Sequence, residues 1–299
     1  MNKPPLRAYI AWIAICIIWG TTYLAIRIGV TDLPPMLFAG SRWIAAGLIL
    51  VIIQRLMGNK LPPKKEIKHL AVVGIALLGI ANGLVVFAEQ WIPSGLAALL
   101  ITTLPFWMVG FESLLPKGPK LNRYIFIGLL LGLSGVFMMF AKDLQHWLQG
   151  SYLLGVFALM GAVIAWSLGS IYSKYKKISV HPMMGASIQM LIAGTLQTLL
   201  GLILGEHNNF HFTQNGFLSI AYLAVFGSIF GYASYIYAIQ HLPLSLVSTY
   251  AYINPIIALI LGWYILNEDL SINILFAAAL IFSGIIMVQK GNYIPSAKE

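Results

Sequence analysis

The chain has 299 residues, of which 59% are hydrophobic and only 9% are charged, and its mean hydropathy is +0.85. Soluble globular proteins contain roughly 45–50% apolar and about 25% charged residues, so the composition excludes a soluble domain and indicates a polytopic membrane protein. The formal net charge of +9 would also suit a nucleic-acid-binding protein, but the positions of the basic residues explain it by membrane topology. No nucleic acid is therefore expected as a partner.

Ten segments are long and apolar enough to cross about 30 Å of hydrocarbon, which takes about 20 residues. Charges, prolines and polar clusters bound them at residues 8–28, 36–57, 68–91, 94–115, 122–141, 151–173, 182–204, 216–240, 245–266 and 272–290. The first segment is too long for a signal-peptide core and no small-residue cleavage site follows it, so we expect an uncleaved span. The short connections at 89–95 and 240–245 leave a count of nine or eight spans open.

Basic residues orient the spans, because cytoplasmic loops retain Lys and Arg. With the N-terminus inside, fifteen of the 18 Lys and Arg residues fall in inner segments, among them Lys3, Lys117, Lys120, Lys177 and Lys298. Arg27 and Lys142 fall in outer segments, and Arg42 lies within a span. The sequence therefore predicts a multi-pass protein of the inner (plasma) membrane with both termini in the cytoplasm. The single cysteine, Cys16, lies in the first span, which excludes an internal disulfide and a cysteine-based metal site; no metal or cofactor is expected.

The two halves of the chain resemble each other at an offset of 147–150 residues. The matched pairs are Trp19/Trp166, Pro35/Pro182, Gly79/Gly227, Gly83/Gly231, Pro93/Pro243, Pro105/Pro255 and Gly135/Gly284. Each copy contains five spans, an odd number, so the second copy must be inverted relative to the first. We therefore predict an all-α integral membrane protein built from two inverted five-helix repeats, 8–141 and 151–290. Inverted repeats are typical of secondary transporters, whose substrate site lies near the midplane at the repeat interface.

Four stretches carry a resemblance to a known family: "WGTTYLAIR", the segment with Pro35 and Arg42, "PSGLAALLITTLPFW" and "YIYAIQHLPLSLVSTYAYINPIIALILGWYILNEDLS". Over about residues 8–290 the chain resembles the ten-helix EamA-type permeases of the drug/metabolite transporter superfamily. The resemblance implies export or exchange of amino acids, metabolites or toxic compounds without nucleotide hydrolysis. The family's acidic turn after the fourth span is replaced here by "PKGPKL", whereas the second copy retains Asn267, Glu268 and Asp269.

Two charged residues inside the apolar segments are candidates for polar recognition, because a charge in hydrocarbon is costly and usually functional. Arg42 lies about 10 Å below the outer rim and Glu89 about 6 Å below it, at 1.5 Å per helical residue. In the functional interpretation Glu89 accepts a proton or a substrate ammonium, while Arg42 holds Glu89 or a substrate carboxylate. The alternative is a structural ion pair or an arginine that snorkels to the outer rim.

Aromatic and amide side chains near the middle of the spans are candidates for the wall of a cavity, since indole and phenol faces bind amphipathic or cationic ligands. The expected wall consists of Trp19, Tyr23, Trp107, Tyr235, Tyr250 and Asn254, and the expected helix hinges are Pro105 and Pro255. We expect the first, third, fourth, sixth, eighth and ninth spans to line the path. The alternative is helix packing and interfacial belts, the role expected for Trp12, Trp43, Trp91, Trp147 and Trp263.

The sequence thus predicts a secondary transporter that exports small amphipathic metabolites such as amino acids, amines or toxic organic compounds by alternating access through a central cavity. The chain contains no Walker-type phosphate loop and no hydrolase or zinc-protease motif, so an enzyme is not expected. An intramembrane enzyme acting on a lipid or metabolite, and a channel, remain the alternatives. The expected partners are a small-molecule substrate and membrane lipid. A monomer is expected, since ten spans offer internal partners to the GxxxG pairs, and a dimer is the open alternative.

Overall fold

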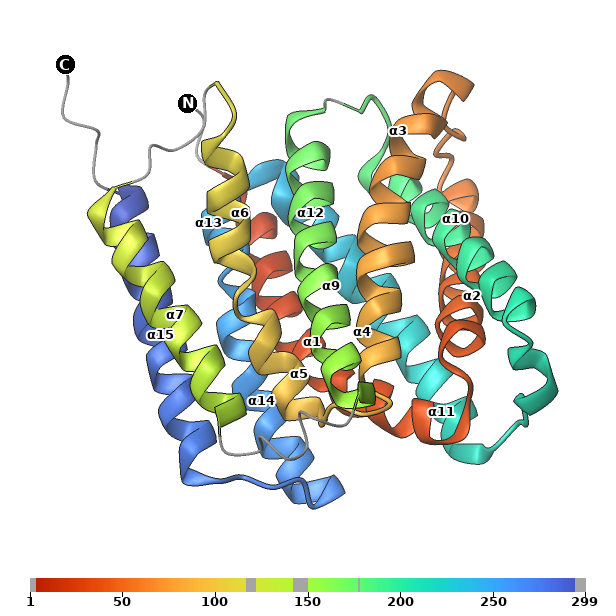
Figure 1. Cartoon of the computed structure of the whole chain (residues 1–299). Coiled ribbons are helices and arrows are strands. Elements are labelled where there is room, and N and C mark those ends of the chain that lie inside the picture. Colours follow the sequence, from red (N-terminus) through yellow and green to blue (C-terminus); the bar gives the residue numbers. More distant parts are fainter. Residues whose placement is uncertain (1–3, 117–121, 142–149, 177, 294–299) are drawn as a thin grey trace.

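The computed structural model describes residues 4–116, 122–141, 150–176 and 178–293, which form a bundle of helices (Figure 1). No strand occurs in these ranges. The first-half helices are α1 Leu6–Asp32, α2 Pro35–Leu56, α3 Lys64–Gly74, α4 Gly83–Ala88, α5 Ser94–Ile101, α6 Leu104–Ser113 and α7 Arg123–Ala141. The second-half helices are α9 Gly150–Tyr175, α10 Pro182–Ile203, α11 Gln214–Tyr222, α12 Ala233–His241, α13 Leu244–Val247, α14 Tyr250–Leu266 and α15 Ile272–Tyr293.

Seven helices of the described residues are long and apolar enough to cross a membrane. They are Leu6–Asp32, Pro35–Leu56, Lys64–Ala88, Ser94–Ser113, Gly150–Tyr175, Pro182–Ile203 and Gln214–His241. The other three predicted spans contain shorter apolar helices, Arg123–Gly132, Tyr250–Leu266 and Ile272–Gly284. An all-helical protein with seven candidate spans is therefore confirmed, whereas the crossing of all ten segments stays a prediction. Of the residues used for orientation and interfacial belts, Lys3, Lys117, Lys120, Lys142, Trp147, Lys177 and Lys298 lie outside the described residues.

Prolines open many of these helices, because a proline has no N–H to leave unsatisfied in the first turn and its φ suits helix entry. Helices begin at or directly after Pro5, Pro35, Pro63, Pro93, Pro182 and Pro243. Left-handed residues follow three helix ends: Gly58 with φ of 83° after α2, Gly205 with 75° after α10 and Asn267 with 53° after α14. This backbone conformation favours glycine or asparagine at a helix C-terminus.

Two helix pairs from different halves form the edges of the bundle in Figure 1: α7 packs along α15, and α2 packs along α10. Their backbones approach so closely that a Cβ atom on Gly194 would lie 2.7 Å from the backbone N of Ile44, and one on Gly284 would lie 2.5 Å from the carbonyl O of Gly128. Small residues permit such contacts between membrane helices. Helices α1 and α9 lie between these edges, α1 against α14 and α9 against α4 and α6. Helix α1 begins and α15 ends near the same end of the bundle (Figure 1).

A π-helical segment interrupts the third span of each half. The first, η1, covers Ile75–Asn82 between α3 and α4, and the second, η3, covers Leu223–Tyr232 between α11 and α12. Their first residues are 148 positions apart, the same offset that relates Gly79 to Gly227. Segments of π-helix are rare and occur frequently at functional sites, so these two mark the middle of the bundle as the place to look for a site.

Candidate substrate-binding site

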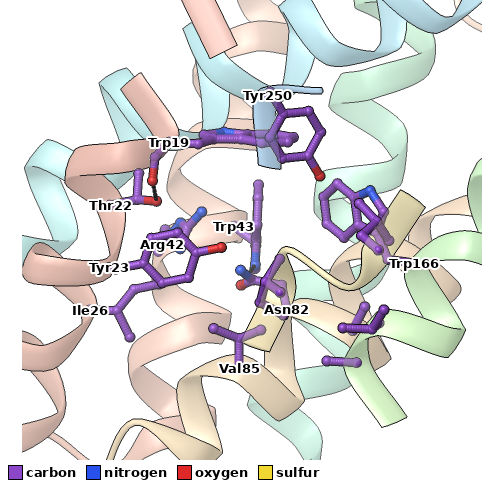
Figure 2. A pocket seen from close by; sticks show the side chains of 15 residues that line it. Trp19, Thr22, Tyr23, Ile26, Arg42, Trp43, Asn82, Val85, Trp166 and Tyr250 are labelled. Carbon is purple, nitrogen blue, oxygen red and sulfur yellow. Dashed lines mark hydrogen bonds between the residues drawn. The ribbon is translucent and has the colours of Figure 1, made fainter. Parts of the chain in front are cut away.

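A cavity of about 70 Å³ lies in the middle of the bundle, several times the space that one water molecule requires. Residues from α1, α2, η1, α4, α5, α6, α9 and α14 enclose it (Figure 2). They are Trp19, Thr22, Tyr23, Ile26, Arg42, Trp43, Ala81, Asn82, Val85, Ile101, Leu104, Ala162, Val163, Trp166 and Tyr250. Both halves of the chain therefore contribute walls to one cavity. The second span lines it, contrary to expectation, and the eighth span, α11 to α12, does not.

Three aromatic rings form the upper wall of the cavity in Figure 2. The ring centroid of Trp19 lies 5.4 Å from that of Trp166 and 5.0 Å from that of Tyr250, with interplanar angles of 86° and 82°. Edge-to-face pairs of this kind are favoured by the quadrupoles of aromatic rings. Trp19 is fixed by its indole N–H, which donates to the carbonyl oxygen of Gly227 in η3 at 2.9 Å. The wall is thus rigid and apolar.

Tyr235, which we expected on this wall, lies one layer behind it. Its ring packs against Trp19 with 5.2 Å between centroids, and its side chain is 0% exposed. Its hydroxyl forms a 2.6 Å hydrogen bond with that of Ser170 and accepts one from the indole N–H of Trp166 at 3.0 Å. Tyr235 therefore orients Trp166 and Trp19 and does not line the cavity.

Arg42 carries the only charge among the described residues that line the cavity. Its side chain is 3% exposed, its Nε donates to the hydroxyl of Ser228 at 3.0 Å, and its Cζ lies 4.2 Å from the ring centre of Trp43. The Nη1 atom of Arg42 is buried without a hydrogen-bond partner. A buried guanidinium with a free N–H is costly, so the arrangement is suited to an anionic group that enters the cavity.

Trp43, which we assigned to helix packing or an interfacial belt, lies on the cavity. It is 2% exposed, lines the cavity beside Arg42, and its indole N–H donates to Oδ1 of Asn82 at 3.0 Å. The physical reason is the tight packing of α2 against α10, which turns this face of α2 toward the protein interior. Trp263, by contrast, is exposed, as expected of a belt residue.

Glu89 lies outside the cavity, at the C-terminal end of α4. Its side chain is 0% exposed, and neither carboxylate oxygen has a hydrogen-bond partner among the described residues. The guanidinium of Arg27 donates to the backbone carbonyl of Glu89, not to its carboxylate. Glu89 and Arg42 therefore form no hydrogen-bonded ion pair among the described residues, although their opposite charges attract each other.

The remaining predicted site residues lie away from the cavity. Trp107 is half-buried and packs on Phe111, with 5.8 Å between ring centroids. Asn254 is buried, and in the amide orientation that satisfies both its ends it donates to the carbonyl oxygens of Cys16 at 2.9 Å and Tyr250 at 3.1 Å. Asn254 thus connects α1 to α14 directly beside the aromatic wall, which is a positioning role.

The two predicted hinges differ. Pro105 is the second residue of α6 and follows a break in the fourth span at Thr102 and Thr103, whose hydroxyls donate to backbone carbonyls three residues earlier. Pro255 lies inside the continuous helix α14, and the break in that span comes earlier, before Tyr250. The residue that follows each break lines the cavity: Leu104 in the fourth span and Tyr250 in the ninth. That the prolines act as hinges stays a prediction.

Four polar or aromatic cavity residues were not among the predicted site residues: Thr22, Trp43, Asn82 and Trp166. Two signals for them were present in the sequence. Trp166 aligns with Trp19 in the repeat, so selecting one implied the other. Asn82 is a lone amide in the apolar stretch "LLGIANGLVV", and an amide at that depth needs a polar partner. No sequence signal distinguished Trp43 from an interfacial tryptophan.

The fold and the cavity together define a helical membrane protein with a buried, largely aromatic cavity lined by both halves. The EamA-like transporter family model matches residues 6–141 and again 153–289. The chain belongs to the EamA-like transporter family and is a membrane transporter.

Similar proteins cover the whole chain. The uncharacterized inner membrane transporter YedA of Escherichia coli K12 is 37% identical over 96% of this chain and 92% of its own. The uncharacterized transporter YoaV of Bacillus subtilis is 26% identical over 94% of this chain and 96% of its own. A solved crystal structure with 21% identity superposes with a TM-score of 0.71 over 94% of this chain and 96% of its own, which supports the fold.

Proposed function

We propose that this chain is a secondary transporter that exports a small amphipathic metabolite by alternating access. In this proposal ten spans form two inverted five-helix repeats, 8–141 and 151–290, which exchange between inward- and outward-open arrangements around the central cavity. The substrate contacts Trp19, Tyr23, Arg42 and Tyr250, with Trp166 and Asn82 added to the predicted set. Tyr235 and Asn254 position these residues, while Glu89 and Trp107 make no contact in this conformation.

The observation that carries the proposal is the shared cavity. Trp19 and Trp166 occupy equivalent positions of the two halves and pack edge to face in its wall. A site between repeats, near the middle of the membrane, is what transporters with inverted repeats use. Relative movement of the halves would separate these two rings and open the cavity to one side.

Three further observations support two inverted repeats. The family model matches each half separately. Helices at equivalent places of the two halves pack as pairs, α2 with α10 and α7 with α15. The π-helical segments η1 and η3 recur at one offset. Ten crossings would also return the C-terminus to the side of the N-terminus, in agreement with the position of the ends of α1 and α15 (Figure 1).

The location we propose is the inner membrane, with both termini in the cytoplasm. The name of the Escherichia coli relative includes this membrane. The distribution of Lys and Arg supports the orientation, since basic loops stay in the cytoplasm. Reaction of an impermeant thiol reagent with intact cells tests it in a Cys16→Ala background. Asn208→Cys should react from outside, whereas Asn59→Cys should not.

Efflux from proteoliposomes tests the transport function even while the substrate is unidentified. Liposomes containing the purified protein are loaded with a mixture of amino acids, amines and carboxylic acids, and the external solution is analysed by mass spectrometry. A transporter releases at least one compound saturably and exchanges it faster against the same compound outside. A channel releases without such exchange, and an enzyme produces a new mass; either result would contradict the proposal.

Trp19→Ala is the informative variant for this assay, and Trp263→Ala is its matched control. Both replace one tryptophan of a membrane helix, but Trp19 is on the cavity and Trp263 is exposed on the outer surface of α14. The proposal predicts that Trp19→Ala reduces the specific efflux at least tenfold and that Trp263→Ala leaves it unchanged. Equal loss in both variants would remove the cavity from the transport path.

A further inference from the structure

We infer that the cavity selects a small organic carboxylate with an aromatic or branched apolar body, in preference to the equivalent amine or zwitterion. This inference rests on the proposed function, because it names the substrate class of the same cavity. It narrows the range of amino acids, amines and organic compounds to molecules with a net negative charge. Three features of the cavity support it: its charge, its free donor and its apolar wall.

The charge of the cavity is positive. Among the described residues that line it, Arg42 is ionisable and basic, and none is acidic. Glu89, the buried acid of the neighbouring α4 end, is not among the lining residues. A cationic ligand would therefore meet a like charge on the lining itself, whereas the Glu89 carboxylate attracts Arg42 from behind the lining. In a buried site with low dielectric, repulsion between two cations in contact is strong. The aromatic rings alone could attract a cation, but Arg42 opposes it.

Arg42 has one free donor. Ser228 holds the Nε edge of Arg42 from η3, and the ring of Trp43 covers one face of the guanidinium at 4.2 Å. These contacts leave Nη1 buried and without a partner. Guanidinium groups bind carboxylates through charge-assisted hydrogen bonds, which are stronger than neutral ones. A substrate carboxylate would therefore satisfy the donor that the protein itself leaves free.

The aromatic and aliphatic wall of the cavity limits the shape of the apolar part of the substrate. Trp19, Trp166 and Tyr250 present ring faces and edges, and Val85 and Ile26 close the lower side (Figure 2). This surface favours an aromatic ring or a branched aliphatic chain. The volume of about 70 Å³ is below the roughly 150 Å³ of an apolar cavity that holds benzene. The cavity must therefore widen to admit even a single ring, which disfavours a fused or extended ring system.

Three compounds with one phenyl body test the charge preference: phenylpyruvate as the anion, phenylalanine as the zwitterion and phenethylamine as the cation. Binding to the detergent-purified wild-type protein is measured by thermal unfolding and by titration calorimetry, up to about 10 mM, where weak ligands still stabilise the folded state. We expect phenylpyruvate to bind at least tenfold more tightly than phenylalanine and phenethylamine to give no shift. Equal or tighter binding of either nitrogen-containing compound, or absence of phenylpyruvate binding, would overturn the inference.

Arg42→Gln removes the charge, and Arg42→Lys retains it without the planar guanidinium. Arg27→Gln is the matched control, because it removes another partly buried arginine that does not line the cavity. We expect Arg42→Gln to weaken phenylpyruvate binding at least tenfold, Arg42→Lys to weaken it less, and Arg27→Gln to leave it unchanged. Unchanged binding in folded Arg42→Gln would overturn the role of Arg42. Should Arg42→Gln fail to fold, Arg42→Lys and the wild-type ligand series still decide the inference.

Flux in proteoliposomes, measured against protein-free liposomes, separates this inference from the proposed function. Saturable exchange of phenylpyruvate that Arg42→Gln abolishes would support both. Tight, Arg42-dependent binding without any flux would contradict the transport function and leave the carboxylate site standing. Saturable flux of phenethylamine or phenylalanine, with none of phenylpyruvate, would support transport and overturn the carboxylate class.

Discussion

Both halves of the chain contain a π-helical segment, but the two segments have different roles. Each half has this segment at the same place in its third span, yet only η1 lines the cavity, through Ala81 and Asn82. Segment η3 stands behind the wall, where its Gly227 carbonyl holds Trp19 and its Ser228 hydroxyl holds Arg42. The two segments thus share their backbone geometry, but η1 lines the cavity and η3 positions residues that line it.

The helix ends show a second difference between the halves. Gly58 and Gly205 both have positive φ, and each precedes a polar residue, Asn59 in the first half and Glu206 in the second. The Glu206 carboxylate accepts the backbone N–H groups of Met36 and Leu37 at the start of α2, at 3.2 and 2.8 Å. The Asn59 amide instead donates to Oε1 of Gln54 within its own half, at 2.8 Å.

Glu268, in the acidic turn that only the second half retains, acts in the same way as Glu206. It accepts the N–H groups of Ser94 at 2.8 Å and Gly95 at 3.1 Å at the start of α5, and the Ser94 hydroxyl at 2.8 Å. Carboxylates at helix N-termini satisfy free N–H groups and oppose the helix dipole. The starts of α10 and α13 have no side-chain cap. Second-half carboxylates therefore cap first-half helices, and in the part of the chain that the structure describes no first-half carboxylate caps α10 or α13.

The largest expected effect comes from a pair of equivalent glycines, Gly231 and Gly83. A methyl group on Gly231 would lie 2.3 Å from Nε1 of Trp19, whereas one on Gly83 would lie at the larger distance of 2.9 Å from Nε2 of Gln197. Overpacking of this kind costs about 1–3 kcal/mol. Gly231→Ala should lower the unfolding temperature most and abolish ligand binding, while Gly83→Ala lowers it less and retains binding. Equal binding in both variants would contradict the supporting role of η3.

Glu268→Ala should have the next largest effect, because it removes three hydrogen bonds that cap α5. We expect a loss of about 2 kcal/mol, in the upper range for a helix cap, measured as a lower unfolding temperature in detergent. Glu268→Gln should lower the free energy of unfolding less, since the glutamine amide oxygen still accepts hydrogen bonds. Asp269→Ala is the control, an acid of the same turn that does not cap α5, and a decrease as large as that of Glu268→Ala would argue against the capping role.

Trp43→Phe tests the hydrogen bond between Trp43 and Asn82 in the wall of the cavity. The substitution retains the aromatic ring beside Arg42 but removes the N–H that Asn82 accepts. The expected loss of unfolding free energy is about 0.5–1.5 kcal/mol, the usual net contribution of one hydrogen bond, together with weaker binding of ligand near Asn82. Trp263→Phe, on the exposed face of α14, should change neither quantity. If Trp43→Phe changed neither the unfolding free energy nor ligand binding, Trp43 would again be interpreted as an interfacial residue.

Glu206→Asn is expected to have the smallest effect of the four. The substitution places at position 206 the residue type that the first half has at the equivalent position, Asn59. It removes the negative charge but leaves an amide oxygen that can still accept a hydrogen bond. The loss should be about 0.5–1 kcal/mol, the size of a charge–dipole interaction near a helix end, and it should shrink in high salt. Salt-independent destabilisation would show that the contact is not electrostatic.

Much of the fold could be predicted from the sequence, because membrane spans are recognisable by their length and hydropathy. The seven long spans fall within a few residues of their predicted boundaries. Trp19, Tyr23, Arg42 and Tyr250 could also be placed on the cavity, since polar or aromatic groups at mid-depth are rare in apolar helices.

Which side of each helix faces the cavity could not be predicted from the sequence. Helices such as α1 and α2 are apolar on every side, because lipid and protein interior are equally apolar, so no hydrophobic stripe marks the inner face. For this reason Tyr235 and Asn254 were expected on the cavity but lie behind it, and Trp43 was assigned to helix packing or an interfacial belt but lies on the cavity. The π-helical segments rotate the helices after them, and nothing in "IALLGIAN" or "LAVFGSIFGY" indicated such segments.

Protection of an introduced cysteine by substrate tests the central claim, that the shared cavity is the transport site. Adjacent threonines provide the probe and its control in a Cys16→Ala background, because Thr22 lines the cavity and Thr21 lies on another face of α1, against Tyr222. The labelling rate of each variant with a small thiol reagent is measured with and without the solute that leaves proteoliposomes. The account predicts that the solute slows labelling of Thr22→Cys and leaves Thr21→Cys unchanged. Unchanged labelling of Thr22→Cys by a transported solute, or equal slowing at both positions, would contradict it.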